Sequence, residues 1–282
     1  MTDKRPYLEA LGIPLWLPRR PLAGGPEPVA AGEPSSHPGA ARQEEPEPLP
    51  DDDWTPPMGD DWEPLIEPDH ADLPPPPAIG REARIVRMGW EELTAEARQC
   101  RACGLCATRT QAVFGVGDRQ AEWLVIGEAP GADEDQQGEP FVGRAGKLLN
   151  PMLLAIGLRR EQAYIANILK CRPPENREPT PAEAAQCRPF LERQMALIRP
   201  RIILAVGRVA AQNLLATDTP IGKLRGQVHR FGPARIPLVV TYHPAYLLRS
   251  PREKRKSWDD LRLARRTLAA EPPGRPGVPP PP

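Results

Sequence analysis

Four short apolar segments, separated by amphipathic ones, set the pattern of this chain. They cover residues 122–127 (EWLVIG), 163–169 (AYIANIL), 201–207 (RIILAVG) and 237–243 (PLVVTYH). Each is an almost uninterrupted run of β-branched and aliphatic residues, which is typical of strands covered on both faces. We therefore predict four buried strands.

Helical patterns lie between and after these segments, at residues 145–158, 181–200, 207–217 and 252–270. Strands that alternate with helices indicate βαβ units, which right-handed crossovers join into a mostly parallel sheet. The predicted fold class is α/β, a three-layer α/β/α arrangement with a central, mainly parallel four-stranded sheet.

The residues suited to chemistry follow the predicted strands. The first strand runs into GEAPG, the second into KCRPP, the third into GR and the fourth into HPAYLLR. Ligands of open α/β sheets bind at the carboxyl ends of the strands. We expect the functional site at that edge of the sheet.

Proline and acidic residues are concentrated before the predicted fold. Residues 21–80 hold 16 of the 40 prolines and 14 of the 37 acidic residues, against one basic residue, Arg42. Such a segment is too polar and too rich in proline to bury a core. We predict an N-terminal linear motif at 1–20, a disordered acidic linker at 21–84, a folded domain at 85–270 and a disordered proline-rich tail at 271–282.

The formal net charge of zero hides an uneven distribution. Outside residues 21–80 the chain has 36 basic and 23 acidic residues, a surplus of 13 positive charges. This surplus favours a polyanionic partner such as nucleic acid, although scattered solubilising charges produce the same count. No run approaches 18 apolar residues and the N-terminus lacks the apolar core of a signal peptide. We expect a cytoplasmic monomer that does not enter a membrane.

Five cysteines form two groups, with Cys100, Cys103 and Cys106 before the first strand and Cys171 and Cys187 after the second. In a reducing compartment, grouped cysteines favour metal binding or redox chemistry over disulfides. Four thiolates suit either an iron–sulfur cluster or a zinc ion. The spacing does not separate these two metals, and it leaves five candidates for four positions.

Four motifs occur in a fixed order over about residues 90–268: the CxxC of 100–103, GEAPGADEDQQGEPFVGRAG, NILKCRPPENREPTPAE with the following cysteine, and HPAYLLR. Together they closely resemble the type 4 uracil-DNA glycosylases, the iron–sulfur branch of the uracil-DNA glycosylase superfamily. The resemblance implies a hydrolase of base excision repair that flips deoxyuridine out of DNA and hydrolyses its N-glycosidic bond, leaving an abasic site.

The resemblance also assigns the cysteines. It implies a [4Fe–4S] cluster bound by Cys100, Cys103, Cys171 and Cys187, whereas Cys106 lies outside the family pattern. It further implies that Phe141 stacks on uracil, that Asn167 reads the O4 and N3–H groups, and that His243 donates a hydrogen bond to O2. Taken singly, these three residues favour structural interpretations instead: core packing for Phe141, a capped strand end for Asn167 and a structural histidine for His243.

The water-activating group is less defined. The best-known members of the superfamily have an aspartate where this chain has Ala129, as type 4 enzymes also lack it. The resemblance implies that backbone groups of Glu128, Ala129 and Pro130 contact uracil and hold the water, so Glu128 is not assigned as a general base. Glu134 either walls off C5 of the base, which excludes the methyl group of thymine, or is a solvated loop carboxylate.

DNA contacts are expected from HPAYLLR. Leu247 or Leu248 would insert into the gap left by the flipped base, and Arg249 would bind phosphate. One branch of the superfamily attaches covalently to uracil through a histidine in the loop after the second strand. Residues 170–187 contain no histidine, so we expect no covalent capture.

The N-terminal PYLEALGIPLWLPRRP is the one apolar stretch outside the predicted fold. Its LGI-x-x-W pattern is similar to the N-terminal peptide of the psi subunit of the bacterial replicative clamp loader, which predicts recruitment to clamp-loader components. Two other functions remain open: a non-catalytic replication or repair accessory that binds DNA or uracil with this fold, and a zinc-stabilised nucleotide-binding domain.

Overall fold

The computed structural model describes residues 80–272. The N-terminal motif, the acidic linker through residue 79 and the tail from residue 273 lie outside the described residues. Helix α2 (Arg81–Ile85) begins four residues before the predicted start of the domain. Between residues 80 and 272 no helix is both long enough and apolar enough to cross a membrane.

The centre of the fold is a mixed sheet in the order β1-β3-β2-β4-β6-β5. Its three inner pairings, β2 with β3, β2 with β4, and β4 with β6, are parallel. The two edge strands pair antiparallel with their neighbours. The strands are β1 (Val116–Gly117), β2 (Trp123–Gly127), β3 (Ala163–Asn167), β4 (Ile202–Val206), β5 (Val228–Phe231) and β6 (Ile236–Thr241).

The four predicted strands are the four inner ones, and every residue in them is buried. The prediction of a four-stranded sheet is nevertheless wrong, because β1 and β5 extend it to six. The β1 strand has only two residues, and β5 is polar, with exposed and half-exposed residues in alternation. Neither edge strand carries the continuous apolar run that marks a covered strand.

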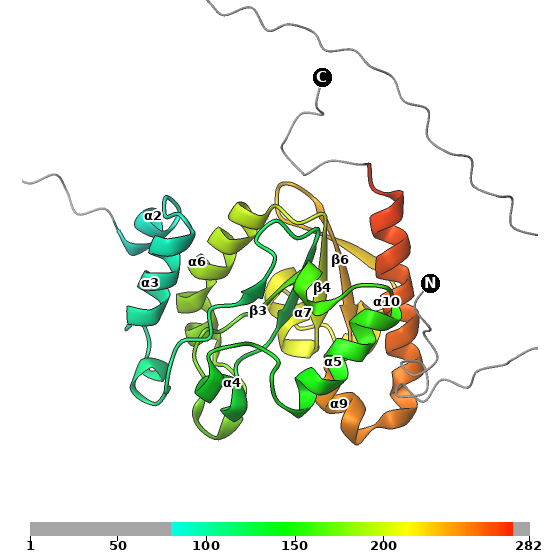
Figure 1. Cartoon of the computed structure of the whole chain (residues 1–282), viewed down its shortest axis with the longest axis horizontal. Coiled ribbons are helices and arrows are strands. Elements are labelled where there is room, and N and C mark those ends of the chain that lie inside the picture. Colours follow the sequence, from blue (N-terminus) through cyan, green and yellow to red (C-terminus); the bar gives the residue numbers. More distant parts are fainter. Residues whose placement is uncertain (1–79, 273–282) are drawn as a thin grey trace, which may run out of the picture. The chain divides into compact units, whose positions relative to one another are not determined.

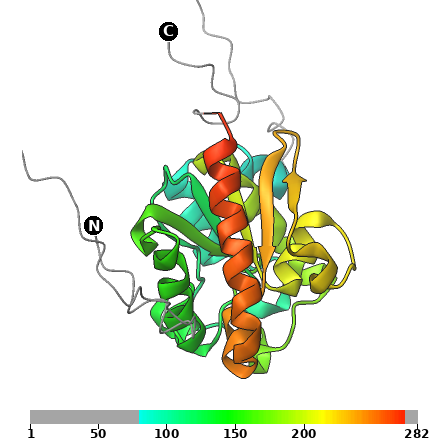
Figure 2. The ribbon, with the colours of Figure 1, turned by 90° about the vertical axis from the view of Figure 1, so that its right-hand side faces the viewer.

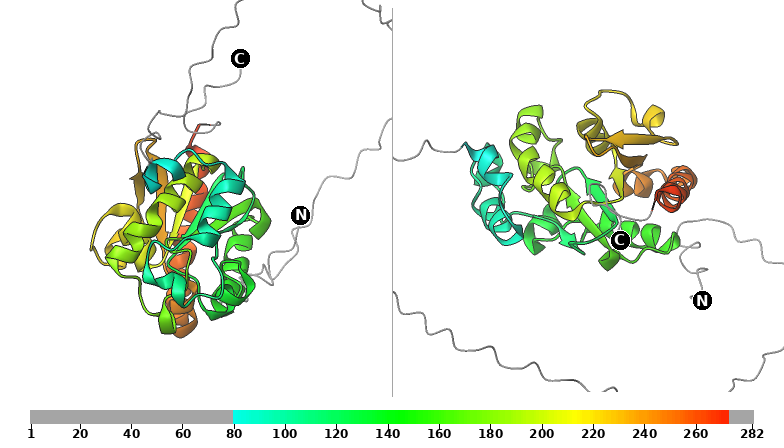
Figure 3. Two further views of the ribbon diagram at one scale, coloured as in Figure 1. Left: turned by 90° about the vertical axis from the view of Figure 1, so that its left-hand side faces the viewer. Right: turned by 90° about the horizontal axis from the view of Figure 1, so that it is seen from above.

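Helices cover both faces of the sheet, which confirms the α/β class. One core packs α5 and α10 against inward-facing side chains such as Val125 and Leu204, and the other packs α6 and α7 against Leu124 and Ile203. Figure 2 shows α10 lying along the sheet, and Figure 3 shows α5 and α6 on opposite sides of it. The helices are α4 (Ala132–Gln137), α5 (Arg144–Ala155), α6 (Pro181–Ile198), α7 (Arg208–Leu215), α8 (Ile221–Leu224), α9 (Pro244–Arg249) and α10 (Lys254–Ala270).

A third apolar cluster lies outside the sheet. Helices α2 and α3 (Trp90–Gln99) pack on α6, as the cyan and yellow-green ribbons of Figure 1 show. The cluster includes Leu93 and Phe190, and also the buried Cys171 and Cys187. Two of the five cysteines therefore belong to a packed core. The short 3₁₀ turns are η2 (Gly104–Ala107), η3 (Arg160–Gln162), η4 (Pro174–Asn176) and η5 (Pro251–Glu253).

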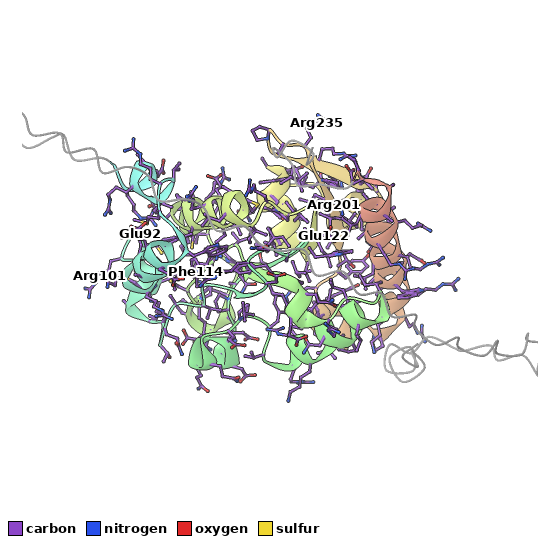
Figure 4. The ribbon with its side chains drawn as sticks, turned by 45° about the horizontal axis from the view of Figure 1, so that its top comes forward. Glu92, Arg101, Phe114, Glu122, Arg201 and Arg235 are labelled. Atoms are coloured by element: carbon purple, nitrogen blue, oxygen red, sulfur yellow. The ribbon has the colours of Figure 1, made fainter. Side chains whose placement is uncertain are left out.

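An ion pair lies at the amino ends of β2 and β4. Arg201 pairs with Glu122 just before β4 and β2, and its guanidinium also donates to the carbonyls of Leu268 and Glu271 at the end of α10. Figure 4 shows Glu122 and Arg201 close together. These contacts fasten α10 to the sheet at the edge opposite the carboxyl ends, which leaves that other edge for the site.

Candidate functional site

A cavity of about 820 Å³ lies at the carboxyl ends of β2, β3, β4 and β6. We call it the strand-end cavity. It collects one group from each strand end that the sequence marked: the GEAPG turn, Asn167, Gly207 and His243. The structure places seven predicted substrate-binding residues in its lining: Glu128, Ala129, Pro130, Glu134, Phe141, Asn167 and His243.

Gly127 allows Phe141 and Asn167 to meet at the floor of this cavity. A Cβ atom on Gly127 would lie 2.5 Å from Oδ1 of Asn167 and 2.6 Å from Cζ of Phe141. Both distances are shorter than real Cβ contacts, so any larger residue would push these two side chains apart. The last residue of β2 therefore sets the spacing between an aromatic face and an amide.

Phe141 is held in a strained backbone conformation. Its φ is +55°, in the left-handed region, which costs a residue other than glycine about 1–3 kcal/mol. Arg160 stabilises this turn, because its guanidinium donates to the carbonyl oxygens of Pro140 (2.5 Å) and Phe141 (3.3 Å). Burial lowers the pKa of Arg160. Strain that is fixed by specific contacts is typical of functional sites.

Asn167 presents an unused acceptor. Its side chain is 2% exposed, and within the described residues its Oδ1 atom has no hydrogen-bond partner. A buried acceptor without a partner costs about 1–3 kcal/mol. A ligand that donates a hydrogen bond at this point would recover that energy.

His243 is a neutral donor. Its Nδ1 accepts a hydrogen bond from the backbone N–H of Ala245 at 3.2 Å, which caps α9, so the ring proton lies on Nε2. Burial, together with the charge of Arg249, lowers the pKa of His243 to about 4. Its ring centre lies 5.6 Å from that of Phe141, with 32° between the planes. The imidazole therefore remains uncharged at neutral pH and can donate a hydrogen bond through Nε2.

Glu128 lies beside an ion pair in the cavity lining. Burial and the negative charge of Glu178 raise its pKa, and the positive charge of Arg208 opposes that shift. Glu178 and Arg208 pair with each other across the cavity, from the loop after β3 and from the first residue of α7. A carboxyl group with a raised pKa in a cleft is a candidate for function. The neighbouring ion pair of Glu178 and Arg208 does not by itself assign Glu128 a role in proton transfer.

The four cysteines of the family pattern share a second, smaller cavity, which we call the thiol cavity. Its lining includes Cys100, Cys103, Cys171 and Cys187, and does not include Cys106. Between residues 80 and 272 no three His, Cys, Asp or Glu side chains come together closely enough to hold a metal ion. The structure therefore shows four thiols that line one cavity.

Positive groups and N–H donors surround these sulfur atoms. Arg109 donates to Sγ of Cys171 at 2.9 Å and Arg81 lies 3.6 Å from Sγ of Cys100, while the backbone N–H of Lys170 donates to Sγ of Cys187 at 3.2 Å. Burial raises the pKa of Cys171 and raises that of Cys187 to about 11. Arg109 and Lys170 oppose these shifts without cancelling them, so the donors favour thiolate character at the sulfur atoms.

Comparison with known proteins agrees with this geometry. The family model of the uracil DNA glycosylase superfamily matches residues 114–262. The type-4 uracil-DNA glycosylase of Archaeoglobus fulgidus is 46% identical over 179 residues, which cover 61% of this chain and 89% of the relative. That of Thermotoga maritima is 42% identical over 162 residues, covering 57% and 83%. The chain belongs to the type-4 branch of the uracil DNA glycosylase superfamily.

Glu134 of this superfamily member is not a solvated loop carboxylate. It is 9% exposed, and it accepts hydrogen bonds from the backbone N–H groups of Gly131, Val142 and Gly143 at 2.9–3.1 Å. It therefore ties the end of the GEAPG turn to the segment after Phe141. The alternative that Glu134 is a solvated loop carboxylate is therefore wrong. Its role next to C5 of the base stays a prediction.

The two leucines of HPAYLLR have opposite environments. Leu247 is fully buried in the core between α5, α9 and the sheet, so it cannot insert into DNA. Leu248 is 39% exposed and is the one of the pair that remains available. Arg249 lines the strand-end cavity. The sequence predicts that Leu247 or Leu248 inserts into the gap left by the flipped base. The alternative of Leu247 is wrong, because α9 turns that side chain into the core.

Several residues of this type-4 family member, in the cavity lining or in contact with it, were missed from the sequence. Tyr242 and Tyr246 line the cavity and pack on each other, with ring centres 5.0 Å apart. Arg225 lies over the ring of Tyr242 and pairs with the buried Asp260 of α10. Tyr242 precedes His243 directly, which was the available signal, whereas nothing local marks Arg225 and Asp260.

Proposed function

We propose that this chain is a monofunctional uracil-DNA glycosylase, which flips deoxyuridine out of DNA and hydrolyses its N-glycosidic bond to leave an abasic site. One observation carries the proposal: the unpaired Oδ1 of Asn167 lies in one cavity with Phe141 and His243. An aromatic face, an amide and a neutral imidazole are the three groups that recognition and release of uracil require.

Asn167 supplies selectivity. Its Oδ1 accepts the N3–H of uracil, and its amide N–H donates to O4. Cytosine has an unprotonated N3 and an amino group at position 4, so it would place acceptor against acceptor and donor against donor. A buried site with a fixed pattern of this kind discriminates strongly, because the wrong base leaves polar groups unpaired.

His243 supplies stabilisation of the leaving group. Cleavage of the glycosidic bond leaves negative charge on uracil and positive charge on the sugar. The Nε2–H of His243 donates to O2 as that charge develops, in the manner of an oxyanion hole. Because its pKa is about 4, the ring is uncharged at neutral pH and donates its Nε2 proton as a neutral group.

The attacking water is held by the backbone of the GEAPG turn. Glu128, Ala129 and Pro130 line the cavity beside Asn167, and Ala129 offers no side chain that could accept a proton. Electrostatic stabilisation and the orientation of the reacting groups therefore account for the rate enhancement. Arg249 and Leu248 contact the DNA around the flipped nucleotide. The segment from Lys170 to Cys187 contains no histidine for covalent attachment.

A [4Fe–4S] cluster bound by Cys100, Cys103, Cys171 and Cys187 completes the proposal. The four thiols share one cavity with nearby cationic donors, which suits the thiolate ligands of an iron–sulfur cluster, and the resemblance to type-4 enzymes favours this cluster over zinc. When bound, the cluster supplies structural cross-links between the α3 end, β3 and α6. Iron and acid-labile sulfide in a brown protein support it, and a colourless protein with one zinc per chain would contradict it.

A uracil-release assay tests the activity. Wild-type protein should release uracil from single- and double-stranded oligonucleotides, and Asn167→Ala should lose most of that activity. Asn213→Ala is the matched control, because the Asn213 amide donates only to the Val209 carbonyl within α7. Wild-type protein that binds uracil-containing DNA without releasing uracil would support the non-catalytic accessory function instead.

Recruitment is a separate proposal that rests on the sequence of residues 1–20. We infer that this motif, outside the described residues, brings a cytoplasmic, monomeric repair enzyme to clamp-loader components at replication forks, where uracil is misincorporated. A tether of this kind raises the local concentration of the enzyme near its substrate. Equal recovery of partners in pull-downs with and without residues 1–20 would contradict it.

A further inference from the structure

Lys170 is a buried charge that the proposed chemistry does not use. It is 2% exposed and is among the largest fully buried side chains of the described residues. It lies between the two cavities, because it follows Asn167 by three residues, precedes Cys171, and lines the thiol cavity. Lysine is almost never buried in this way unless it is paired.

Its contacts join the two cavities directly. The ammonium Nζ donates to the backbone carbonyl of Asn167 at 2.9 Å, and the backbone N–H donates to Sγ of Cys187 at 3.2 Å. The backbone of the same segment continues the pairing with β2, because Ile168 and Leu169 donate to the carbonyls of Gly127 and Glu128. A shift of Lys170 would therefore move both the end of β3 and the GEAPG turn.

The charge of this ammonium needs an anion. A single carbonyl does not offset the cost of removing an ammonium from water. Lys170 lines the thiol cavity together with Cys171 and Cys187, whose sulfurs become anions when they bind a metal. A methionine would fill the same space without that cost, so packing does not explain a lysine here. The thiolates of a bound cluster do explain it.

We propose that Lys170 is a positioning residue that couples the cysteine-bound cluster to uracil recognition: its ammonium offsets the charge of the Cys171 and Cys187 thiolates and holds the carbonyl of Asn167, which fixes the Asn167 amide at the end of β3. This inference rests on the proposed function. It predicts that cluster retention and uracil binding weaken together when the charge is removed.

Lys170→Met in the full chain tests the coupling, with two readouts. The first is the rate at which visible absorbance and bound iron are lost in excess chelator, which needs no DNA. The second is the separate measurement of kcat and KM for uracil release, together with inhibition by free uracil. Lys170→Met keeps the backbone N–H that donates to Cys187 and removes only the charge beside the thiols. It should lose iron about tenfold faster, the usual scale for the loss of an outer-shell partner of a metal site. Its KM and the inhibition constant for uracil should rise by a similar factor, about tenfold, with a smaller change in kcat.

Gln194→Met is the matched control. Gln194 is fully buried in the same helix as Cys187, but its amide donates to the Phe114 carbonyl and the Tyr164 hydroxyl, away from both cavities. It should lower stability without changing iron loss or KM. Lys170→Arg keeps the charge and should retain the cluster better than Lys170→Met, which separates charge from folding.

The outcomes distinguish this inference from the proposed function. Active wild-type protein whose Lys170→Met variant keeps wild-type iron loss and KM overturns the role of Lys170 alone. Changes equal to those of Gln194→Met overturn it as well, since they would reflect general destabilisation. Wild-type protein that binds no iron overturns the coupling, and wild-type protein that releases no uracil overturns the proposed function.

Discussion

The strand-end cavity is built from the carboxyl ends of four buried strands, whereas the thiol cavity is built mostly from segments outside the sheet. Asn167 and His243 are placed by β3 and β6, and Gly127 at the end of β2 sets the spacing between Asn167 and Phe141. Cys100 and Cys103 lie on a loop after α3, and Cys187 lies in α6. The hydrogen-bonded sheet therefore fixes the residues of the strand-end cavity, whereas a loop and a helix position most of the thiol cavity.

The polar groups of the two cavities also differ. In the strand-end cavity the notable group is an unpaired acceptor, Oδ1 of Asn167, beside a neutral histidine. In the thiol cavity, Arg109 and Lys170 bring positive charge to buried sulfur. The two cavities therefore differ in what they offer a ligand: the strand-end cavity offers an open hydrogen-bond acceptor, and the thiol cavity surrounds buried sulfur with positive groups.

The largest expected effect is on the thiol cavity. Cys187→Ser removes the proposed cluster ligand on α6, and the loss of a metal ligand costs on the order of 4 kcal/mol. In a domain of this size that lowers Tm by about 10 °C, and the visible absorbance should disappear. Tm and the absorption spectrum measure both effects.

Cys106→Ser is the control for that variant, because Cys106 is a half-buried thiol that does not line the thiol cavity. It should keep both the colour and the Tm of wild type. If the two serine variants behave alike, the distinction between ligand and bystander cysteines fails.

The second effect concerns charge stabilisation in the strand-end cavity. His243→Ala should lower kcat by about 10²–10³-fold, the usual loss when one donor to a developing oxyanion is removed. Single-turnover uracil release measures it. His229→Ala changes a histidine of edge strand β5 whose ring contacts the Leu224 carbonyl, and should leave kcat unchanged. A loss below threefold for His243→Ala would remove His243 from the mechanism.

The third effect tests whether the sheet sets the spacing of the cavity. Gly127→Ala pushes Phe141 and Asn167 apart, and a displacement of about 1 Å costs about 10²-fold in rate. Gly104→Ala is the matched change in the thiol region, where a Cβ meets nothing within 4 Å, and it should be neutral. Equal kcat/KM values for the two variants would show that Gly127 does not control the geometry.

The smallest effect is the response to pH. A folded-state pKa of about 4 for His243 means that the native protein resists a proton that the unfolded chain accepts below about pH 6.5. Stability should therefore fall as pH drops from 6.5 towards 4, and kcat should show no inflection near 6.5. An inflection at that pH that is absent from His243→Ala would contradict a neutral, buried ring.

The sequence predicted the inner sheet because continuous apolar runs are unambiguous when both faces are covered. It did not predict β1, which has two residues, or β5, whose exposed residues resemble a loop. It grouped the GEAPG turn, Asn167 and His243 because parallel strand ends meet at one edge. Family resemblance, not spacing, separated Cys106 from the other cysteines.

The errors arose where a side chain's direction decides its role. Leu247 and Leu248 are identical neighbours, and only the rotation of the short helix α9 buries one and exposes the other. Glu134 reads as a polar loop residue until three backbone donors converge on it. Nothing local marked Lys170 as buried, since its surroundings include Cys187 of α6, which lies 17 residues further along the chain.

The most direct test of the account is the position of uracil bound to the cluster-loaded protein, determined by crystallography after addition of free uracil. We expect the base to stack on Phe141, with N3 within hydrogen-bond distance of Oδ1 of Asn167 and O2 facing Nε2 of His243. Uracil bound outside the strand-end cavity, or inside it with O2 turned away from His243, would contradict the account.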